Sequence, residues 1–162
     1  VKNHGLLENK KLSKKLGQNF LLDSRITERI AQAAQPLRGF HIIEVGPGPG
    51  GLTRSLLKAG ADHVVAIERD PHCFEALKPL VDISCGKLTV IQNDALKIIP
   101  QTVVTSPFKI VANLPYHIGT QLLLNWLKDL EGLHSLTLMF QKEVALRITA
   151  SPGSKDYGRL SV

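Results

Sequence analysis

The hydrophobic positions of the chain follow two alternating patterns. Short continuous apolar runs, typical of buried parallel strands, occupy residues 42–45, 63–68, 88–91, 108–112 and 136–140. Between them, apolar residues repeat at helical spacing over 25–34, 52–60, 71–80, 122–127 and 142–149. Because strands that alternate with helices pair in parallel through right-handed crossovers, this order predicts an α/β fold with a mainly parallel, doubly wound sheet.

Glycine and polar residues close four of these predicted strands. Gly46 follows the first strand, Glu68 ends the second, Asp94 follows the third and Asn113 follows the fourth. The carboxyl ends of parallel strands meet at one edge of a sheet, where doubly wound folds bind their ligands. We therefore expect these residues to border a single ligand site, although Glu68 and Asp94 taken singly also fit ordinary helix caps.

The residues from Gly46 to Gly51 form a glycine-dense turn between the first strand and the following helix. Such a turn lets backbone N–H groups approach a ligand closely, because glycine adopts unusual φ angles and has no side chain. Its spacing matches the fingerprint of dinucleotide-binding proteins, with Glu68 near the position expected to bind ribose. A nicotinamide-dependent (NAD) oxidoreductase is therefore one hypothesis.

Glu44 argues for a different ligand. This carboxylate lies two residues before Gly46, where it would repel a pyrophosphate but suit a ligand that carries an ammonium group. S-adenosylmethionine has an ammonium group, a sulfonium and no phosphate. In this second hypothesis Gly46 and Gly48 lie under the methionine part, Glu68 accepts hydrogen bonds from the ribose hydroxyls, and Asp94 accepts one from the adenine amino group.

The segment Asn113-Leu114-Pro115-Tyr116, directly after the fourth strand, suggests a reaction at an exocyclic amine. The lone pair of such an amine is delocalised into the base, so the amine is a poor nucleophile. The Asn113 side-chain oxygen and the Leu114 carbonyl can accept both of its N–H groups, while Tyr116 stacks on the base. Because a sulfonium is an excellent leaving group, positioning then does most of the work. The alternative is a proline-terminated strand with a packed tyrosine.

Basic residues are concentrated toward the N-terminus. The net charge is +6, and residues 1–40 hold eight lysines and arginines against three acids. Clustered cations favour a nucleic-acid partner. We therefore predict a flexible basic arm over residues 1–15 that contacts RNA, with a merely solvated tail as the alternative; its candidate contacts are Lys10, Lys11, Lys14 and Lys15. Residues 16–162 are predicted to form one domain.

Cysteine content and hydropathy narrow the classes of protein to which this chain can belong. Cys73 and Cys85 are too few and too poorly spaced for a zinc site or a disulfide framework, so we expect no metal and a reducing, cytoplasmic compartment. No apolar run approaches the about 20 residues that a membrane span requires, so we expect no membrane partner.

Five segments in this order resemble the ribosomal RNA adenine dimethyltransferases, most closely the bacterial small-subunit rRNA dimethyladenosine transferases. They are Leu16-Gly17-Gln18-Asn19-Phe20-Leu21, Glu44-Val45-Gly46-Pro47-Gly48, Asn113-Leu114-Pro115-Tyr116, Phe140-Gln141-Lys142-Glu143-Val144 and Tyr157-Gly158-Arg159-Leu160-Ser161-Val162. The resemblance covers residues 10–162. It implies a Rossmann-like class I methyltransferase core that uses S-adenosylmethionine and releases S-adenosylhomocysteine.

The resemblance also implies roles that the spacing does not. Asn19 and Leu21 would contact the cofactor as part of a lid, and Asn113 would contact it together with Gly46, Gly48, Glu68 and Asp94. Phe140 would sandwich the target adenine against Tyr116. By pattern alone Phe140 is a core residue. Lys142 and Arg147 become candidates for RNA phosphates, with a solvated helix face as the alternative.

Two departures from the family pattern affect the expected site and extent of the chain. His117 and Gly119 stand where the small-subunit enzymes usually have Asn and Ser, which affects the detail of the target pocket. The last two strands of the family and its C-terminal helical lobe are expected to be absent, because the chain stops where the helix that precedes them should begin.

The expected function is therefore dimethylation of adenine N6 on two adjacent adenosines of small-subunit ribosomal RNA during ribosome biogenesis. The expected partner is the immature small ribosomal subunit, and the protein is expected to be a monomer. Three alternatives stay open: a large-subunit dimethyltransferase of the macrolide-resistance type, a non-catalytic RNA-binding or assembly protein, and the NAD-dependent oxidoreductase.

Overall fold

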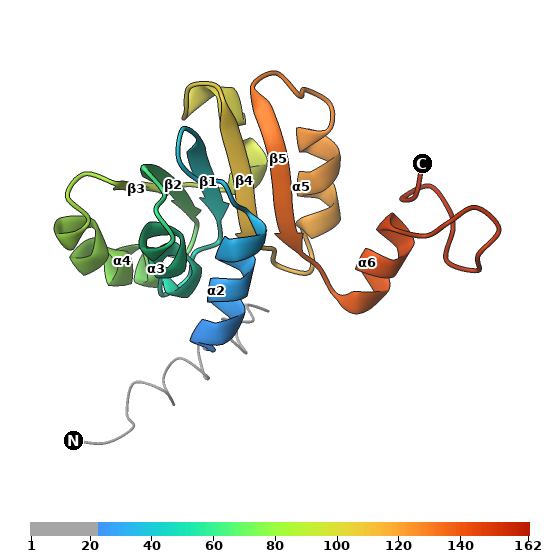
Figure 1. The fold of residues 1–162 in the computed structure, drawn as a ribbon, viewed down its shortest axis with the longest axis horizontal. Coiled ribbons are helices and arrows are strands. Elements are labelled where there is room, and N and C mark those ends of the chain that lie inside the picture. The colour runs from blue at the N-terminus through green and yellow to red at the C-terminus, as the bar shows by residue number, and fades with distance from the viewer. Residues whose placement is uncertain (1–22) are drawn as a thin grey trace.

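The structure, a computed structural model, describes residues 23–162, and its elements alternate between strands and helices (Figure 1). The strands are β1 (His41–Val45), β2 (His63–Glu68), β3 (Leu88–Gln92), β4 (Phe108–Asn113) and β5 (Leu133–Met139). The helices are α2 (Ser24–Ala33), α3 (Gly51–Lys58), α4 (Pro71–Ile83), α5 (Gly119–Trp126) and α6 (Lys142–Ile148), with short 3-10 helices η1 (Ala95–Lys97) and η2 (Pro100–Thr102).

The five strands form one parallel sheet in the order β3-β2-β1-β4-β5. This confirms the predicted doubly wound α/β fold. The chain leaves β3 at one edge and returns to the centre as β4, so the strand order reverses between β1 and β4. A crevice forms at such a reversal beyond the carboxyl ends of the strands, where ligands of doubly wound folds bind.

Alternate side chains of the central strand enter two separate cores. Ile42 packs with residues of α2, α3 and α4 on one face of the sheet, whereas its neighbour Ile43 packs with α5 residues, including Trp126, on the other. Because both faces are covered, the strands need the continuous apolar runs from which they were predicted. Figure 1 shows the helices on the two sides of the sheet.

Three features differ from the sequence prediction or extend it. The link from β3 to β4 contains the two 3-10 helices, which no periodic pattern indicated. Strand β5 begins at Leu133 and ends at Met139, so Phe140 lies just beyond the strand rather than inside it. Helix α6 has no buried residue and lies with the C-terminal segment beyond the β5 edge (Figure 1). None of the helices within residues 23–162 is long and apolar enough to cross a membrane.

Candidate active site

The glycine turn after β1 is held in place by hydrogen bonds to the end of β2. Gly46 and Gly48 have φ angles of +68° and +54°, a region that favours glycine. The Gly46 N–H donates to the Ile67 carbonyl at 3.0 Å, and the Gly48 N–H donates to Oε2 of Glu68 at 3.0 Å. The ends of β1 and β2 therefore lie side by side, as predicted, and the Glu68 side chain accepts the hydrogen bond of the Gly48 N–H.

Glu68 is an internal carboxylate, with only 2% of its surface exposed. Its Oε1 accepts the Asp70 N–H at 2.8 Å, so each carboxylate oxygen has one backbone donor. Burial raises the pKa of Glu68, while these backbone hydrogen bonds act in the opposite direction. The backbone N–H groups of Gly48, Asp70 and Arg69 all act on this carboxylate, which has about four acceptor sites, so acceptor capacity remains for a ribose hydroxyl.

Glu44 lies deeper than the sequence argument assumed. Its side chain is 1% exposed, its Oε2 accepts the Thr53 hydroxyl at 2.7 Å, and it does not line the cavity described below. Burial raises the pKa of Glu44 to about 8, and the negative charge of Glu68 adds to the shift. In this structure Glu44 links β1 to helix α3 through its hydrogen bond with Thr53. The sequence suggested that Glu44 contacts the ammonium group of a ligand, but Glu44 is not among the residues that line the cavity.

Asp94 closes β3 as predicted and begins η1. Its Oδ1 accepts the N–H of Leu96 at 3.0 Å, which makes it the cap of that 3-10 helix. Its Oδ2 lies 3.6 Å from a guanidinium nitrogen of Arg69, the residue directly after Glu68. The carboxylate is thus both a helix cap and part of an ion pair with the end of the neighbouring strand.

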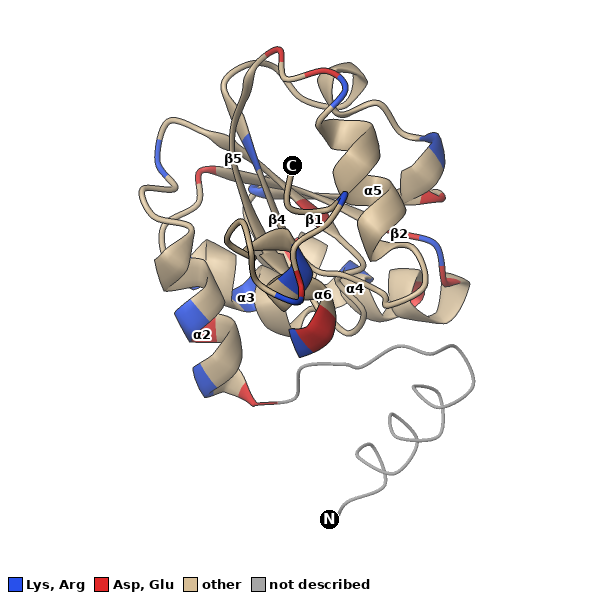
Figure 2. Ribbon diagram, turned by 90° about the vertical axis from the view of Figure 1, so that its right-hand side faces the viewer, with Lys and Arg blue, Asp and Glu red and all other residues tan. Residues whose placement is uncertain are grey.

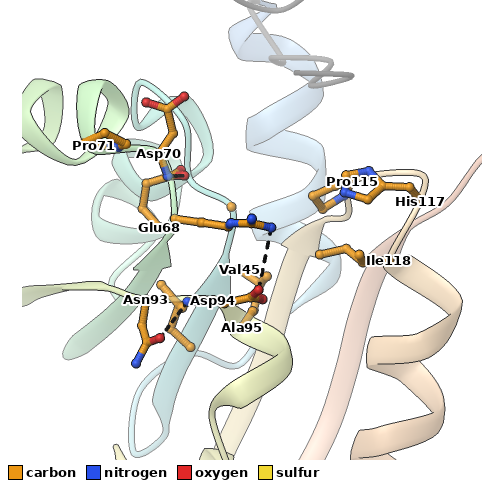
Figure 3. Close-up of a pocket in the computed structure, with 13 residues that line it drawn as sticks. Val45, Glu68, Asp70, Pro71, Asn93, Asp94, Ala95, Pro115, His117 and Ile118 are labelled. Carbon is orange, nitrogen blue, oxygen red and sulfur yellow. Dashed lines mark hydrogen bonds and ion pairs between the residues drawn. The ribbon is translucent and has the colours of Figure 1, made fainter. Parts of the chain in front are cut away.

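These strand ends surround a cavity of about 320 Å³, within the size range of small-molecule sites (Figure 3). Acidic side chains lie on one side of it, from Glu68 through Asp70 to Asp94, and the Pro115–Ile118 turn lies opposite. Val45 and Ile67 supply apolar surface at its base. The cavity therefore combines an apolar floor with hydrogen-bond acceptors, a combination that suits a nucleoside.

A second, much narrower groove lies behind the same turn. Tyr116 and Phe140 both line it, with Leu114, Gly119 and Val144 among their neighbours. Its volume is about 10 Å³, and Tyr116 is 50% exposed. The predicted pairing of Tyr116 and Phe140 around one space is consistent with this placement, although an adenine enters only if one of the rings moves.

Pro115 lines both spaces, the cavity and the groove. It follows Asn113 and Leu114, the residues predicted to receive an amine, and Asn113 ends β4 next to Met139 of β5. The buried Leu114 side chain anchors the turn in the core beside α5. The predicted amine-binding segment therefore borders both the cavity and the groove, and Pro115 is the residue that they share.

The ring of Phe140 packs against the backbone of Gly119. A Cβ atom added at Gly119 would lie 3.2 Å from Cε1 of Phe140 and 3.3 Å from Cβ of Leu114, which is tighter than most such contacts. The ring therefore packs directly on the backbone at the start of α5. A side chain at position 119 would therefore require Phe140 or Leu114 to shift by a few tenths of an ångström.

The remaining predicted site residues are less well defined by the structure. Lys142 and Arg147 lie exposed on α6, one at its start and one in its last turn, so both are accessible (Figure 2). Asn19 and Leu21, and the arm residues Lys10, Lys11, Lys14 and Lys15, lie outside the described residues. Within 23–162, no group of three or more His, Cys, Asp or Glu residues could hold a metal ion.

Sequence reasoning missed two residues that shape the site. Arg69 lines the cavity and pairs with Asp94, and its only signal was its place directly after the strand-ending Glu68. Pro115 was named only as a member of the segment after the fourth strand, but it lines both the cavity and the groove.

Solved structures share this architecture. A dimethyladenosine transferase from Plasmodium falciparum superposes with a TM-score of 0.77 and 29% identity, covering 89% of this chain and 51% of that one. The 23S rRNA methyltransferase ErmE has a TM-score of 0.73 and 30% identity, covering 83% of this chain and 53% of that one. The fold and its strand-end site define a Rossmann-like methyltransferase domain.

The sequence profile described as "Ribosomal RNA adenine dimethylase" matches residues 9–162. The chain belongs to this family. Ribosomal RNA small subunit methyltransferase A of Paracoccus denitrificans is 57% identical over 152 residues, covering 92% of the chain and 54% of that protein. The protein of the same name from Xanthobacter autotrophicus is 54% identical over 166 residues, covering the whole chain and 56% of that protein. The chain thus spans little more than half the length of these relatives.

Proposed function

We propose that this chain is the cofactor-binding and adenine-presenting part of an enzyme that dimethylates adenine N6 on two adjacent adenosines of small-subunit ribosomal RNA. S-adenosylmethionine is the proposed donor and S-adenosylhomocysteine the product. The observation that carries the proposal is Pro115, which lines both the nucleoside-sized cavity and the groove between Tyr116 and Phe140. Because one residue borders both spaces, the two spaces are neighbours, and direct transfer requires the methyl group and the target amine to meet at the edge of Pro115.

The cavity residues fit S-adenosylmethionine better than a dinucleotide. The N–H groups of Gly46 and Gly48 already donate to Ile67 and Glu68, so these two donors of the turn are not free for a pyrophosphate. Glu68 and Asp94 also bring negative charge that opposes phosphate. Glu68 retains acceptor capacity for the ribose diol, Asp94 for the adenine amino group, and the Gly46–Gly48 turn supports the methionine part.

The chemistry then depends on positioning. When bound, the cofactor supplies an electrophilic methyl group on its sulfonium. The Asn113 side-chain oxygen and the Leu114 carbonyl accept the two N–H groups of the target amine, which frees its lone pair from the ring. Tyr116 and Phe140 fix the plane of the base. No strong general base is needed, since the leaving group is good.

RNA contacts complete the proposal. Lys142 and Arg147 lie on α6. This helix follows β5 and Phe140 in the chain and lies beyond the β5 edge of the sheet (Figure 1). Cations placed beside the base groove would bind the phosphates that flank the target. Lys10, Lys11, Lys14 and Lys15 are proposed as further contacts, and Asn19 and Leu21 as cofactor contacts. The proposed partner is the immature small ribosomal subunit.

The small-subunit target rests on the relatives named ribosomal RNA small subunit methyltransferase A, which share more than half of the aligned residues. The likeness to a 23S rRNA methyltransferase keeps the large-subunit RNA as the competing substrate. The non-catalytic assembly protein is the second competitor. These three possibilities differ in which RNA, if any, receives methyl groups.

Two measurements test the proposal. Calorimetry on this chain should show binding of S-adenosylhomocysteine and none of NAD; the reverse pattern would reject the cofactor. The protein that carries this chain at the full length of its relatives should transfer labelled methyl groups to unmethylated small-subunit particles. Asn113→Ala should abolish this transfer and leave RNA binding nearly unchanged. Transfer to large-subunit RNA instead, or no transfer at all, would favour the respective alternative.

A further inference from the structure

Arg69 reaches across the cavity mouth from the end of β2 to the end of β3. Its guanidinium lies 3.6 Å from Oδ2 of Asp94. The Arg69 side chain is 75% exposed, whereas that of Asp94 is 21% exposed. Both residues line the 320 Å³ cavity, so the pair lies inside the candidate cofactor site rather than on an unrelated surface.

The acceptor capacity of Asp94 makes this contact consequential. Its Oδ1 is occupied by the Leu96 N–H, which caps η1 and fixes the orientation of the carboxylate. Oδ2 is the more open of the two oxygens, because one acceptor site of Oδ1 is filled, and Oδ2 faces Arg69 in an ion-pair contact of 3.6 Å. An adenine amino group that donates to Oδ2 therefore has to displace the guanidinium or share this oxygen with it.

We propose that Arg69 is an internal competitor for the adenine subsite: it holds Asp94 Oδ2 in the empty site and is displaced when the 6-amino group of the cofactor binds. This inference rests on the proposed function, because it takes Asp94 as the adenine acceptor. Arg69 then weakens cofactor binding and makes the affinity depend on ionic strength. It is a specificity residue, since only a purine with a donor at position 6 replaces the guanidinium.

The size of the effect follows from the exposure of the pair. Ion pairs with one highly exposed partner contribute little, so removing the competitor should tighten binding by about two- to fivefold. Salt screens exposed charges strongly, since the Debye length falls from about 10 Å at 0.1 M to about 3 Å at 1 M. Added salt should therefore tighten cofactor binding to the wild-type chain, the opposite of ordinary electrostatic binding.

The test is calorimetry of this chain with S-adenosylhomocysteine, which carries no net charge of its own. Arg69→Met keeps the aliphatic stem and removes the guanidinium; it should bind about two- to fivefold more tightly at low salt. The wild-type affinity should rise with salt toward the variant's value, while the variant's affinity stays constant. In an Asp94→Asn background the effect of Arg69→Met should vanish, because the competed charge is gone.

Lys87→Met is the matched control, because it removes one positive charge at the amino end of β3, away from Asp94 at the carboxyl end. It should leave the affinity unchanged. Equal or weaker binding by Arg69→Met would overturn the inference, and weaker binding would assign Arg69 to stacking on the base. If the wild-type chain binds no S-adenosylhomocysteine, the proposed cofactor itself is rejected. If the wild-type chain binds it and Arg69→Met binds it equally well, only the inference about Arg69 is rejected.

Discussion

Oε2 of Glu68 accepts a hydrogen bond from the Gly48 N–H at 3.0 Å, across twenty residues of sequence. The residue that the sequence marked as a ribose acceptor is therefore also the clamp of the glycine turn. Its other oxygen holds the Asp70 N–H at the start of α4. One carboxylate thus joins the ends of β1 and β2 to the helix that follows, so its loss affects structure and ligand binding together.

Glu68→Ala should reduce stability and abolish cofactor binding. It leaves two backbone N–H groups without their acceptor in a buried place, which costs about 1–3 kcal/mol for each. Urea denaturation should show the loss of stability, and calorimetry with S-adenosylhomocysteine the loss of binding. Glu75→Ala, an exposed change on α4, should remain within about 0.5 kcal/mol of wild type. A fully stable Glu68→Ala chain would contradict the role of the clamp.

Glu44→Gln should remove a fall in stability between pH 4.5 and about 8. Burial raises the pKa of Glu44 from 4.5 to about 8 in the folded chain, so the folded state holds a proton that the unfolded state has lost between these values. Stability from this group is present below pH 4.5 and is lost as the pH rises toward and through about 8. Glutamine cannot ionise but can still accept the Thr53 hydroxyl.

Melting temperatures of wild type and Glu44→Gln between acidic and alkaline pH would check this. The difference should grow in favour of the variant as the pH rises. Thr53→Val provides the matched comparison: it removes a hydrogen bond that lowers the pKa of Glu44, so the loss of stability should extend to higher pH. Parallel curves for wild type and Glu44→Gln would show that Glu44 is ionised in the folded chain.

The sequence predicted the sheet well because its information is local and repeated. Each of the five strands contains a short, mostly apolar run, and Ile42 and Ile43 need such a run because they enter different cores. The strand-end residues Glu68 and Asp94 were also found, since parallel strands bring their ends together. The 3-10 helices between β3 and β4 are three residues long, too short to show a repeating pattern of apolar residues, so the sequence could not predict them.

Details that depend on side-chain direction were beyond the sequence. Glu44 was expected to face a ligand, but its position in β1 gives no sign of the Thr53 hydroxyl that faces it from α3. Arg69 read as an exposed charge after a strand, and only the spacing of β2 and β3 brings it to Asp94. The double role of Pro115 likewise depends on how α5 and β5 pack against its turn.

Tyr116→Ala should weaken methyl transfer to RNA without changing cofactor affinity. The ring lines the groove and not the cavity, so its loss removes stacking on the base alone. Stacking on an aromatic side chain contributes about 1–3 kcal/mol per base, which corresponds to about five- to more than hundredfold in catalytic efficiency. Steady-state transfer by the full-length protein measures this, and Tyr116→Phe should retain most of the rate. Equal losses in both variants would point to the hydroxyl instead of the ring.

Lys109→Ala should destabilise the chain without touching the site. The buried ammonium donates to the Ala34 carbonyl at 3.0 Å and lies 4.5 Å from the centre of the Phe40 ring. Ala34 is the C-cap of α2, so the lysine satisfies a carbonyl at the helix terminus from inside the core. Alanine removes this bond and leaves a void, which should cost about 2–4 kcal/mol.

Chemical denaturation of Lys109→Ala and Lys109→Met separates the two contributions. Methionine fills the space but cannot donate, so its loss should be smaller than that of alanine. Lys97→Met, at an exposed position of η1, serves as the surface control and should be neutral. If both Lys109 variants were as stable as wild type, the buried bond to Ala34 would contribute nothing.

The strand order divides the two halves of the proposed reaction along the chain. Within the described residues, the ribose and adenine acceptors Glu68 and Asp94 come from the ends of β2 and β3, whereas the residues assigned to the target base follow β4 and β5. Pro115 is the point at which the halves meet. A chimera that exchanges residues 113–147 with another family member can therefore change which base is modified while the donor half remains intact, so the fold separates the two specificities into exchangeable modules.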